Sequence, residues 1–201
     1  MAIKMSKGSR ISLTKGTSLR EALAGLGWDT NRYHGSDEFD LDLVLFECDD
    51  KMQCIDEKHI VFYNNKVRDT NGKWIIADPE LAIKHSGDNR TGQGDGDDES
   101  AIIDFAKLNP KVENIVVVAT IYDADARRQN FGMVDNAYIR IVDNESGKEI
   151  ARYDLGESFS KETAVIFGEL KRIAGDWDFQ AVGKGAKDLE ALCIDYGLEV
   201  E

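Results

Sequence analysis

The chain of 201 residues carries 38 acidic and 25 basic side chains, which gives a formal net charge of −13. Hydrophobic residues make up 42% of the sequence, enough to bury a core, so a chain that is disordered throughout is excluded. The excess of acid argues against nucleic-acid binding, which needs a basic face, and favours a cation or a basic partner. At roughly 100–200 residues per domain, we expect one domain spanning 1–201.

Two features bear on where the protein works. Its three cysteines, Cys48, Cys54 and Cys193, cannot all pair within one chain and form no CxxC motif, which favours a reducing compartment. The first ten residues lack the apolar segment of a signal peptide, and the longest apolar run, 115–122, is far shorter than the ~20 residues that span a bilayer. We therefore expect a soluble protein of the cytoplasm.

Most segments show the period of β-strands. In chain order, we predict strands at 10–14, 39–46, 59–63, 114–122, 137–142, 149–153, 164–170 and 177–182. One amphipathic helix is predicted at 186–196, and a short helical turn is expected between Asp104 and Asn109-Pro110. Short strands joined by Gly, Asn and Asp turns predict an all-β sandwich or barrel. The stretch 66–84 has the pattern of an insertion, with its own hairpin around Thr70-Asn-Gly72.

A Gly-rich loop at 88–99 is the most informative segment. It gathers Asp88, Asp95, Asp97, Asp98 and Glu99. Glycines let backbone carbonyls fold inward and carboxylates supply hard oxygens, so the loop offers both kinds of ligand that Ca²⁺ takes. The alternative interpretation is a solvated acidic loop without a metal.

The loop does not fit known calcium motifs. Asp88 and Glu99 match the first and last positions of an EF-hand, but Arg90, Gly92 and Gln93 occupy its third, fifth and sixth positions, and the flanks are strands. A calcium β-roll needs stacked repeats, and only one is present.

Two further acidic groups lie elsewhere in the sequence. Asp40 and Asp42 share one face of the predicted strand 39–46, about 7 Å apart by strand rise, opposite a face of Phe39 and leucines. Two like charges there repel unless a positive group lies between them. The third group, Asp123 and Asp125, follows the buried strand 114–122, and pairing with Arg127 or Arg128 is an equal alternative to metal binding.

Several ordered motifs resemble one protein family. They are Gly25-Leu-Gly-Trp-Asp29, Asp40-Leu-Asp42, Phe62-Tyr-Asn-Asn65, Gly87-Asp-Asn-Arg-Thr-Gly92, Asp97-Asp98, Gln129-Asn-Phe-Gly132, Asn136-Ala-Tyr-Ile-Arg140, Glu149–Leu155 and Phe167-Gly-Glu-Leu170. Together they resemble the TerD family of tellurium-resistance and stress proteins over nearly the whole chain. The resemblance implies a cytoplasmic two-sheet β-sandwich with acidic calcium-binding loops and a short C-terminal helix, acting in a tellurite and general stress response. The chain departs from the family's pattern at two places: Glu38 interrupts an acidic run, and the segment 66–86 is longer than expected of the family.

The resemblance also implies the metal ligands, with more than one Ca²⁺ ion expected. They are carboxylates, amide oxygens and glycine carbonyls at positions that match the family's motifs. Glu99 is added for its chemistry, and Asp29 and Asp123 are further members. The full set is Asp29, Asp40, Asp42, Asn64, Asn65, Asp88, Asn89, Gly92, Gly94, Asp97, Asp98, Glu99 and Asp123. Zinc binding by Cys48, Cys54 and His59 is disfavoured because a fourth soft ligand and the usual spacing are missing.

We expect a non-catalytic, calcium-dependent binding or scaffold module. We expect the chain to bind other tellurium-resistance or stress proteins and to be able to self-associate. We expect no nucleic-acid partner. One alternative is a metal-dependent phosphoester hydrolase, which the sequence disfavours because no clear His or Lys proton donor lies near the acids. Another alternative is a module that binds membrane surfaces through Ca²⁺.

Overall fold

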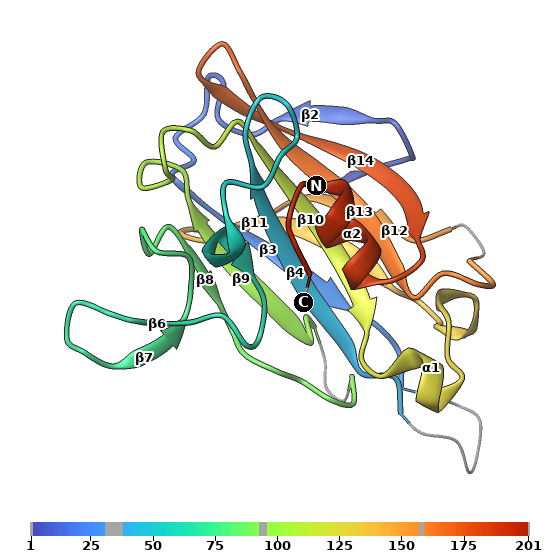
Figure 1. The fold of residues 1–201 in the computed structure, drawn as a ribbon. Helices are drawn as coiled ribbons and strands as arrows, with labels where there is room; N and C mark the ends of the chain where they lie inside the picture. The colour runs from blue at the N-terminus through green and yellow to red at the C-terminus, as the bar shows by residue number, and fades with distance from the viewer. Residues whose placement is uncertain (1, 31–37, 93–95, 157–158, 201) are drawn as a thin grey trace.

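Alternating apolar residues build two six-stranded sheets packed face to face in the computed structural model, which describes residues 2–30, 38–92, 96–156 and 159–200 (Figure 1). One sheet has the order β1–β12–β11–β3–β9–β8 and the other β2–β14–β13–β10–β4–β5, while β6 and β7 form a separate pair. The predicted all-β class and two-sheet sandwich are confirmed.

The first sheet consists of β1 (Ile3–Lys4), β12 (Glu149–Asp154), β11 (Tyr138–Asp143), β3 (Glu21–Gly27), β9 (Glu99–Asp104) and β8 (Ile83–His85). The second consists of β2 (Arg10–Ser12), β14 (Asp176–Ala186), β13 (Ala164–Ile173), β10 (Asn114–Ile121), β4 (Leu41–Cys48) and β5 (Ile60–Val61). The remaining elements are β6 (Lys66–Arg68), β7 (Trp74–Ile76), the 3₁₀ turns Glu57–His59 and Phe131–Met133, α1 (Ala124–Arg127) and α2 (Leu189–Asp195).

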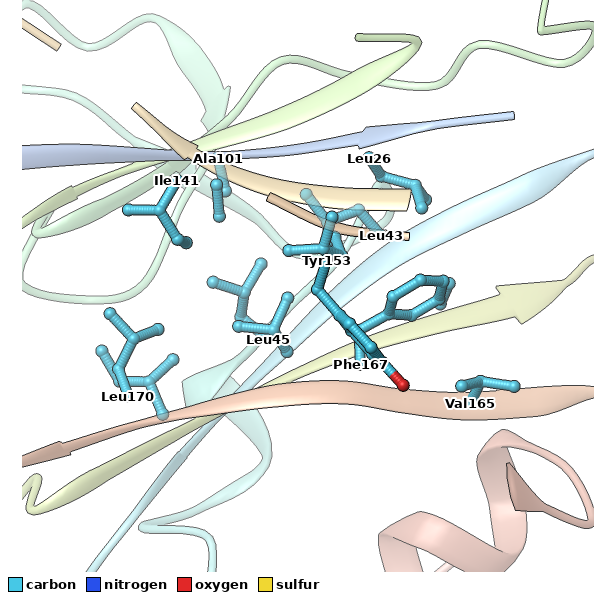
Figure 2. Packing of buried hydrophobic residues seen from close by; sticks show 14 of the residues in the cluster. Leu26, Leu43, Leu45, Ala101, Ile141, Tyr153, Val165, Phe167 and Leu170 are labelled. Carbon is cyan, nitrogen blue, oxygen red and sulfur yellow. The ribbon is translucent and has the colours of Figure 1, made fainter. Parts of the chain in front are cut away.

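The main core lies between the sheets. Leu43 and Leu45 of β4 and Phe167 of β13 face Leu26 of β3 and Ile141 of β11 across it (Figure 2). These side chains are fully buried, and their burial is the main stabilising contribution to the fold. The predicted alternation of 39–46 is therefore correct for its apolar face.

The opposite face of the second sheet is covered by the C-terminal helix. Val44 and Phe46 of β4 pack with Leu192 of α2 in a second apolar cluster. Asp188 begins the helix, because its side chain accepts a hydrogen bond of 2.8 Å from the Ala191 N–H. The helix therefore starts later than predicted, since Ala186 still pairs with Ala164 in the sheet.

Further features differ from the sequence analysis, among them the short strands β1 and β8, which were not predicted. Strands β3 and β9 were not predicted either. The small residues of Glu21–Gly27 carry little β-propensity, and Glu99, the first residue of β9, ends an acidic, Gly-rich run that is typical of a loop. The helical turn expected after Asp104 is wrong. Asp104 instead closes a turn by accepting from the Ala106 N–H at 3.1 Å, and the Asn109 side chain closes the next one.

The hairpin predicted around Gly72 is confirmed. Strands β6 and β7 pair in antiparallel fashion and extend away from the sandwich (Figure 1). Gly72 adopts a φ of 78°, a left-handed conformation that glycine tolerates at no steric cost. None of the helices in the described ranges has the length and apolar character needed to cross a membrane.

A tight contact in β13 gives a test of the fold. A Cβ on Gly168 would lie 2.8 Å from the Gln180 carbonyl oxygen and closer still to the buried ring of Phe179. We expect Gly168→Ala to lower stability by about 1–3 kcal/mol, since backbone cannot yield as a side chain can. In thermal unfolding this corresponds to a fall of roughly 2–12 °C. Gly156→Ala is the matched control, because no atom of the described residues lies within 4 Å of a Cβ there; equal melting of both variants would contradict the packing described.

Candidate metal centre

Three predicted ligands meet at one end of the sandwich. Asp40 and Asp42 lie at the start of β4, and Asp88 lies in the loop between β8 and β9. One carboxylate oxygen from each falls within 4.8 Å of the other two, and within the described ranges no other three Asp, Glu, His or Cys side chains meet this criterion. Asp40 and Asp88 are far apart in the sequence, but they meet here because the start of β4 and the loop before β9 come together at this end of the sandwich.

The carboxylates open into a small pocket of about 140 Å³. Its other lining residues are Tyr63, Arg90, Tyr122 and Arg127. Arg127 pairs with Asp40 at 3.3 Å, and the exposed Arg90 pairs with Asp88 at 2.9 Å. Asp42 is only 5% exposed, and no cationic side chain of the described residues lies within ion-pair distance of it.

The electrostatics of the site disfavour its negative charge. Burial is the main cause that raises the pKa of Asp42 to about 8, and the charges of Glu99, Asp40 and Asp88 raise it further. Burial also raises the pKa of Asp40, although Arg127 opposes this. Without a cation the buried charge is therefore costly, and Asp42 binds a proton instead.

The donor set fits a calcium ion. Oxygens on opposite sides of Ca²⁺ are separated by twice a bond length of about 2.3–2.6 Å, so three oxygens that all lie within 4.8 Å of one another can contact a single ion. Three carboxylates are hard ligands of the kind Ca²⁺ prefers, and the open pocket leaves room for water to complete six to eight ligands.

Glu99 shapes the site and is not free to point into it. Its two oxygens accept hydrogen bonds from the Leu43 N–H at 2.7 Å and the Asn89 N–H at 3.1 Å. Asn89 is also fully engaged, because its amide donates to Asp98 at 3.2 Å and its oxygen accepts from the Thr91 N–H. These bonds hold the loop that carries Asp88 against β4.

Asp97 and Asp98 lie apart from the three-carboxylate group. Arg140 makes two bonds to Asp97, at 2.7 and 3.0 Å, and Asp97 lies over Gly25, where a Cβ would collide with it. Asp98 accepts a hydrogen bond from the Trp28 N–H at 3.0 Å. The acidic run 97–99 thus supplies hydrogen-bond acceptors to the loop and sheet.

The structure does not bring the remaining predicted residues into the group. The Asn65 amide donates to the Lys58 and Ile60 carbonyls, and Asn64 and Asn65 line a different pocket beside β7. Asp29 accepts a hydrogen bond from Asn136 at 2.7 Å.

The last three predicted positions are two glycines and one aspartate. Gly92 packs under the Trp28 indole with a φ of 62°. Asp123 is exposed at the start of α1 and lines a neighbouring pocket with Asp42. Gly94 lies outside the described residues.

Sequence reasoning missed the aromatic and basic lining. Tyr63 and Tyr122 end segments that were identified as strands, but nothing in their pattern assigns them to the pocket. Arg127 was considered as a partner of Asp123 or Asp125; its partner in the structure is Asp40, which is distant in sequence. The one sequence signal for a role of Arg127 at the pocket was its position directly after the acidic residues that follow β10.

The fold and this site define a β-sandwich with an acidic, cation-compatible pocket at one end. The TerD domain family model matches residues 1–196, and the chain belongs to that family. General stress protein 16U of Bacillus subtilis (strain 168) is 44% identical, with 100% of each chain covered. Tellurium resistance protein TerD of Serratia marcescens is 43% identical, with 98% of each chain covered. A solved TerD homologue of Streptomyces coelicolor A3(2), 21% identical, superposes with a TM-score of 0.64 over 88% of this chain and 95% of its own.

The raised pKa of Asp42 predicts a pH dependence of the metal-free protein. Its folded pKa is about 8 and its ordinary value 3.8, so between these values the unfolded chain releases a proton that the folded chain keeps. Stability therefore falls as pH rises from about 4 to 8, by at most about 1.4 kcal/mol per pH unit from this group. We expect Asp42→Asn to remove this contribution to the pH dependence of stability. In chelator, the stability that the variant gains over the wild type should therefore grow as the pH rises toward 8.

Urea unfolding at pH 5, 6, 7 and 8 measures this difference. The exposed Asp50→Asn is the control and should follow the wild type at every pH. If the profiles of Asp42→Asn and wild type run parallel, the carboxyl of Asp42 is not the buried acid described.

Proposed function

We propose that this chain is a non-catalytic, calcium-dependent binding module that acts in a tellurium-resistance and stress response. The observation that carries the proposal is the convergence of Asp40, Asp42 and Asp88 at a pocket whose two arginines pair with Asp40 and Asp88. A bound Ca²⁺ would supply positive charge to Asp42, which has no cationic partner of its own among the described residues. The names of the stress and tellurium-resistance relatives support the setting.

Calcium is favoured over magnesium by the kind of site. Mg²⁺ requires near-ideal octahedral geometry and releases its waters reluctantly, whereas Ca²⁺ accepts irregular shells. Here Asp42 comes from a strand, Asp40 from the residue just before that strand and Asp88 from a loop, an arrangement with adjustable geometry.

Calcium binding would also change the surface. Arg90 is held at the pocket rim by Asp88, and Arg127 by Asp40. An ion that takes these carboxylates competes with both arginines, which would then be free to contact acidic groups of a partner. This gives a physical route from calcium to partner binding, whether the partner is another stress protein or a second copy of the chain.

Two other functions remain as outcomes of the test. A phosphoester hydrolase needs an open metal position and a proton donor, and the described pocket lining offers arginines and tyrosines but neither His nor Lys. Hydrolysis of a generic phosphodiester that depends on Asp42 would support it. Calcium-dependent co-sedimentation with anionic vesicles would support a membrane-surface module.

The proposal predicts that calcium stabilises the protein. At a hundredfold excess over Kd, binding to the folded state adds about 2.7 kcal/mol, which for this size raises the melting temperature by roughly 5–10 °C. Mg²⁺ at the same concentration should have a smaller effect. Asp42→Asn and Asp88→Asn should lose the calcium shift because each removes a charged ligand, while Asp50→Asn should retain it.

Melting curves of these proteins in calcium, magnesium and chelator decide the matter. Equal shifts with the two ions would argue against calcium, and a calcium shift that survives in both ligand variants would place the site elsewhere.

A further inference from the structure

Two cysteines lie directly opposite each other at the end of β4 that is far from the acidic pocket. Cys48 is the last residue of β4, and it forms an antiparallel bridge with Cys54 across a short turn. The N–H of the residue after each cysteine donates to the carbonyl of the residue before the other, at 2.8 and 3.0 Å. This pattern makes the cysteines a non-hydrogen-bonded pair, the closer of the two kinds of antiparallel pair.

This arrangement has the geometry that a disulfide needs. A disulfide joins residues whose Cα atoms are usually about 4.4–6.8 Å apart and whose Cβ atoms face each other. The Cα atoms of a non-hydrogen-bonded pair lie about 4.5 Å apart, and directly opposite side chains project from the same face. Cys48 and Cys54 accordingly pack in the same apolar cluster, against α2. A bond between their sulfurs therefore requires no rearrangement of the backbone.

The chain on both sides of Cys54 holds it in this register. Within the turn, one oxygen of Asp49 accepts hydrogen bonds from two backbone N–H groups, at 2.8 and 2.9 Å. The Cys54 N–H donates to the Tyr196 carbonyl at the end of α2, at 2.8 Å. The turn and the helix thus keep Cys54 opposite Cys48.

The two thiols differ in access and in acidity. Cys48 is fully buried, whereas Cys54 is half-buried and lines an open pocket of about 540 Å³. A hydrogen bond from the Cys48 thiol lowers the pKa of Cys54, although burial opposes this. The same hydrogen bond, and then burial, raises the pKa of Cys48. Because the thiolate is the nucleophile, Cys54 is the thiol that reacts first.

The pocket beside Cys54 favours one kind of oxidant. Its lining includes three acidic residues and one lysine, namely Asp49, Asp50, Glu113 and Lys111. The excess of negative charge repels anionic oxidants and leaves neutral ones free to approach. Hydroperoxides are neutral oxidants that react with thiolates.

We propose that Cys48 and Cys54 form a redox-active thiol pair that a neutral hydroperoxide converts to a disulfide. With hydrogen peroxide, the Cys54 thiolate attacks one oxygen, so that an S–O bond forms, the O–O bond breaks, and the leaving hydroxide takes up a proton to become water. The Cys48 sulfur then attacks the sulfur of the Cys54 sulfenic acid. The S–S bond forms, the S–O bond breaks, and the oxygen leaves with the Cys48 proton as a second water. In total the two thiols lose two electrons and the peroxide gains them.

The thiol pair is separate from the calcium pocket. Cys48 lies six residues from Asp42 along β4, about 20 Å by strand rise. The inference therefore goes beyond calcium binding, and its tests are run in chelator so that their outcome does not depend on whether calcium binds.

The competing explanation is that the cysteines are small apolar side chains without a redox role. Peroxide would then leave all three thiols of the chain unchanged, or would oxidise the accessible Cys54 alone to sulfinic acid. Counting the free thiols and mapping the link separates these outcomes from a disulfide.

The experiment treats the folded, reduced protein with hydrogen peroxide, alkylates the remaining thiols and maps the peptides by mass spectrometry without reduction. We expect the free thiols to fall from three to one per chain, and dithiothreitol to restore all three. Trypsin cleaves after Lys51, between the two cysteines, so the disulfide should join two peptides. Three free thiols after treatment, oxidation of Cys54 without a link, or a link that includes Cys193 overturns the proposal.

Two variants test the separate roles of the thiols. Cys193→Ser is the matched control, because Cys193 lies on α2 and outside the bridge, so this variant should form the same disulfide. Cys54→Ser removes the reactive thiol, so the buried Cys48 should stay reduced through the treatment. Both substitutions replace half-buried side chains, and we expect both variants to fold, which melting curves check. A folded Cys193→Ser protein that forms no disulfide, or a folded Cys54→Ser protein that loses the Cys48 thiol, also overturns the proposal.

Discussion

The backbone of Leu43 is the point on which this end of the molecule depends. On the edge of β4 that faces away from β10, β5 pairs at Leu45 and Phe46, and no described strand pairs with that edge at Leu43. The Leu43 N–H donates to Glu99 at 2.7 Å, and the Leu43 carbonyl accepts from the His85 Nε2 at 3.1 Å. Since the Gly87 N–H donates to Nδ1 of His85, the ring proton belongs on Nε2. Side chains of one sheet thus satisfy the strand edge of the other.

This link has an electrostatic consequence. Holding Glu99 at the Leu43 N–H puts its carboxylate beside Asp42, where it is the largest charge, after burial, that raises the pKa of Asp42. Its other oxygen holds the Asn89 N–H and so positions Asp88 at the same pocket. The bonds that join the two sheets therefore also gather the carboxylates. Arg127 and Arg90 balance part of this charge from the rim, and Asp42 is left for a proton or a cation.

Much of this was available from the sequence, and the reason is local periodicity. The alternation of 39–46 placed Phe39 and the leucines inside and predicted that Asp40 and Asp42 share a face. It could not show β3 or β9, whose small or charged residues carry weak strand signals. The density of acid at 97–99 suggested ligands, yet Arg140 takes Asp97 and backbone N–H groups take Asp98 and Glu99. Such partners lie tens of residues away, and charge density in a loop does not reveal them.

A crystal structure of the protein grown with calcium tests the central claim most directly. The account predicts an ion bound by oxygens of Asp40, Asp42 and Asp88 at about 2.3–2.6 Å, with Arg127 or Arg90 displaced from its carboxylate. A calcium-soaked crystal in which both arginines keep their carboxylates and no ion lies among the three aspartates would contradict it.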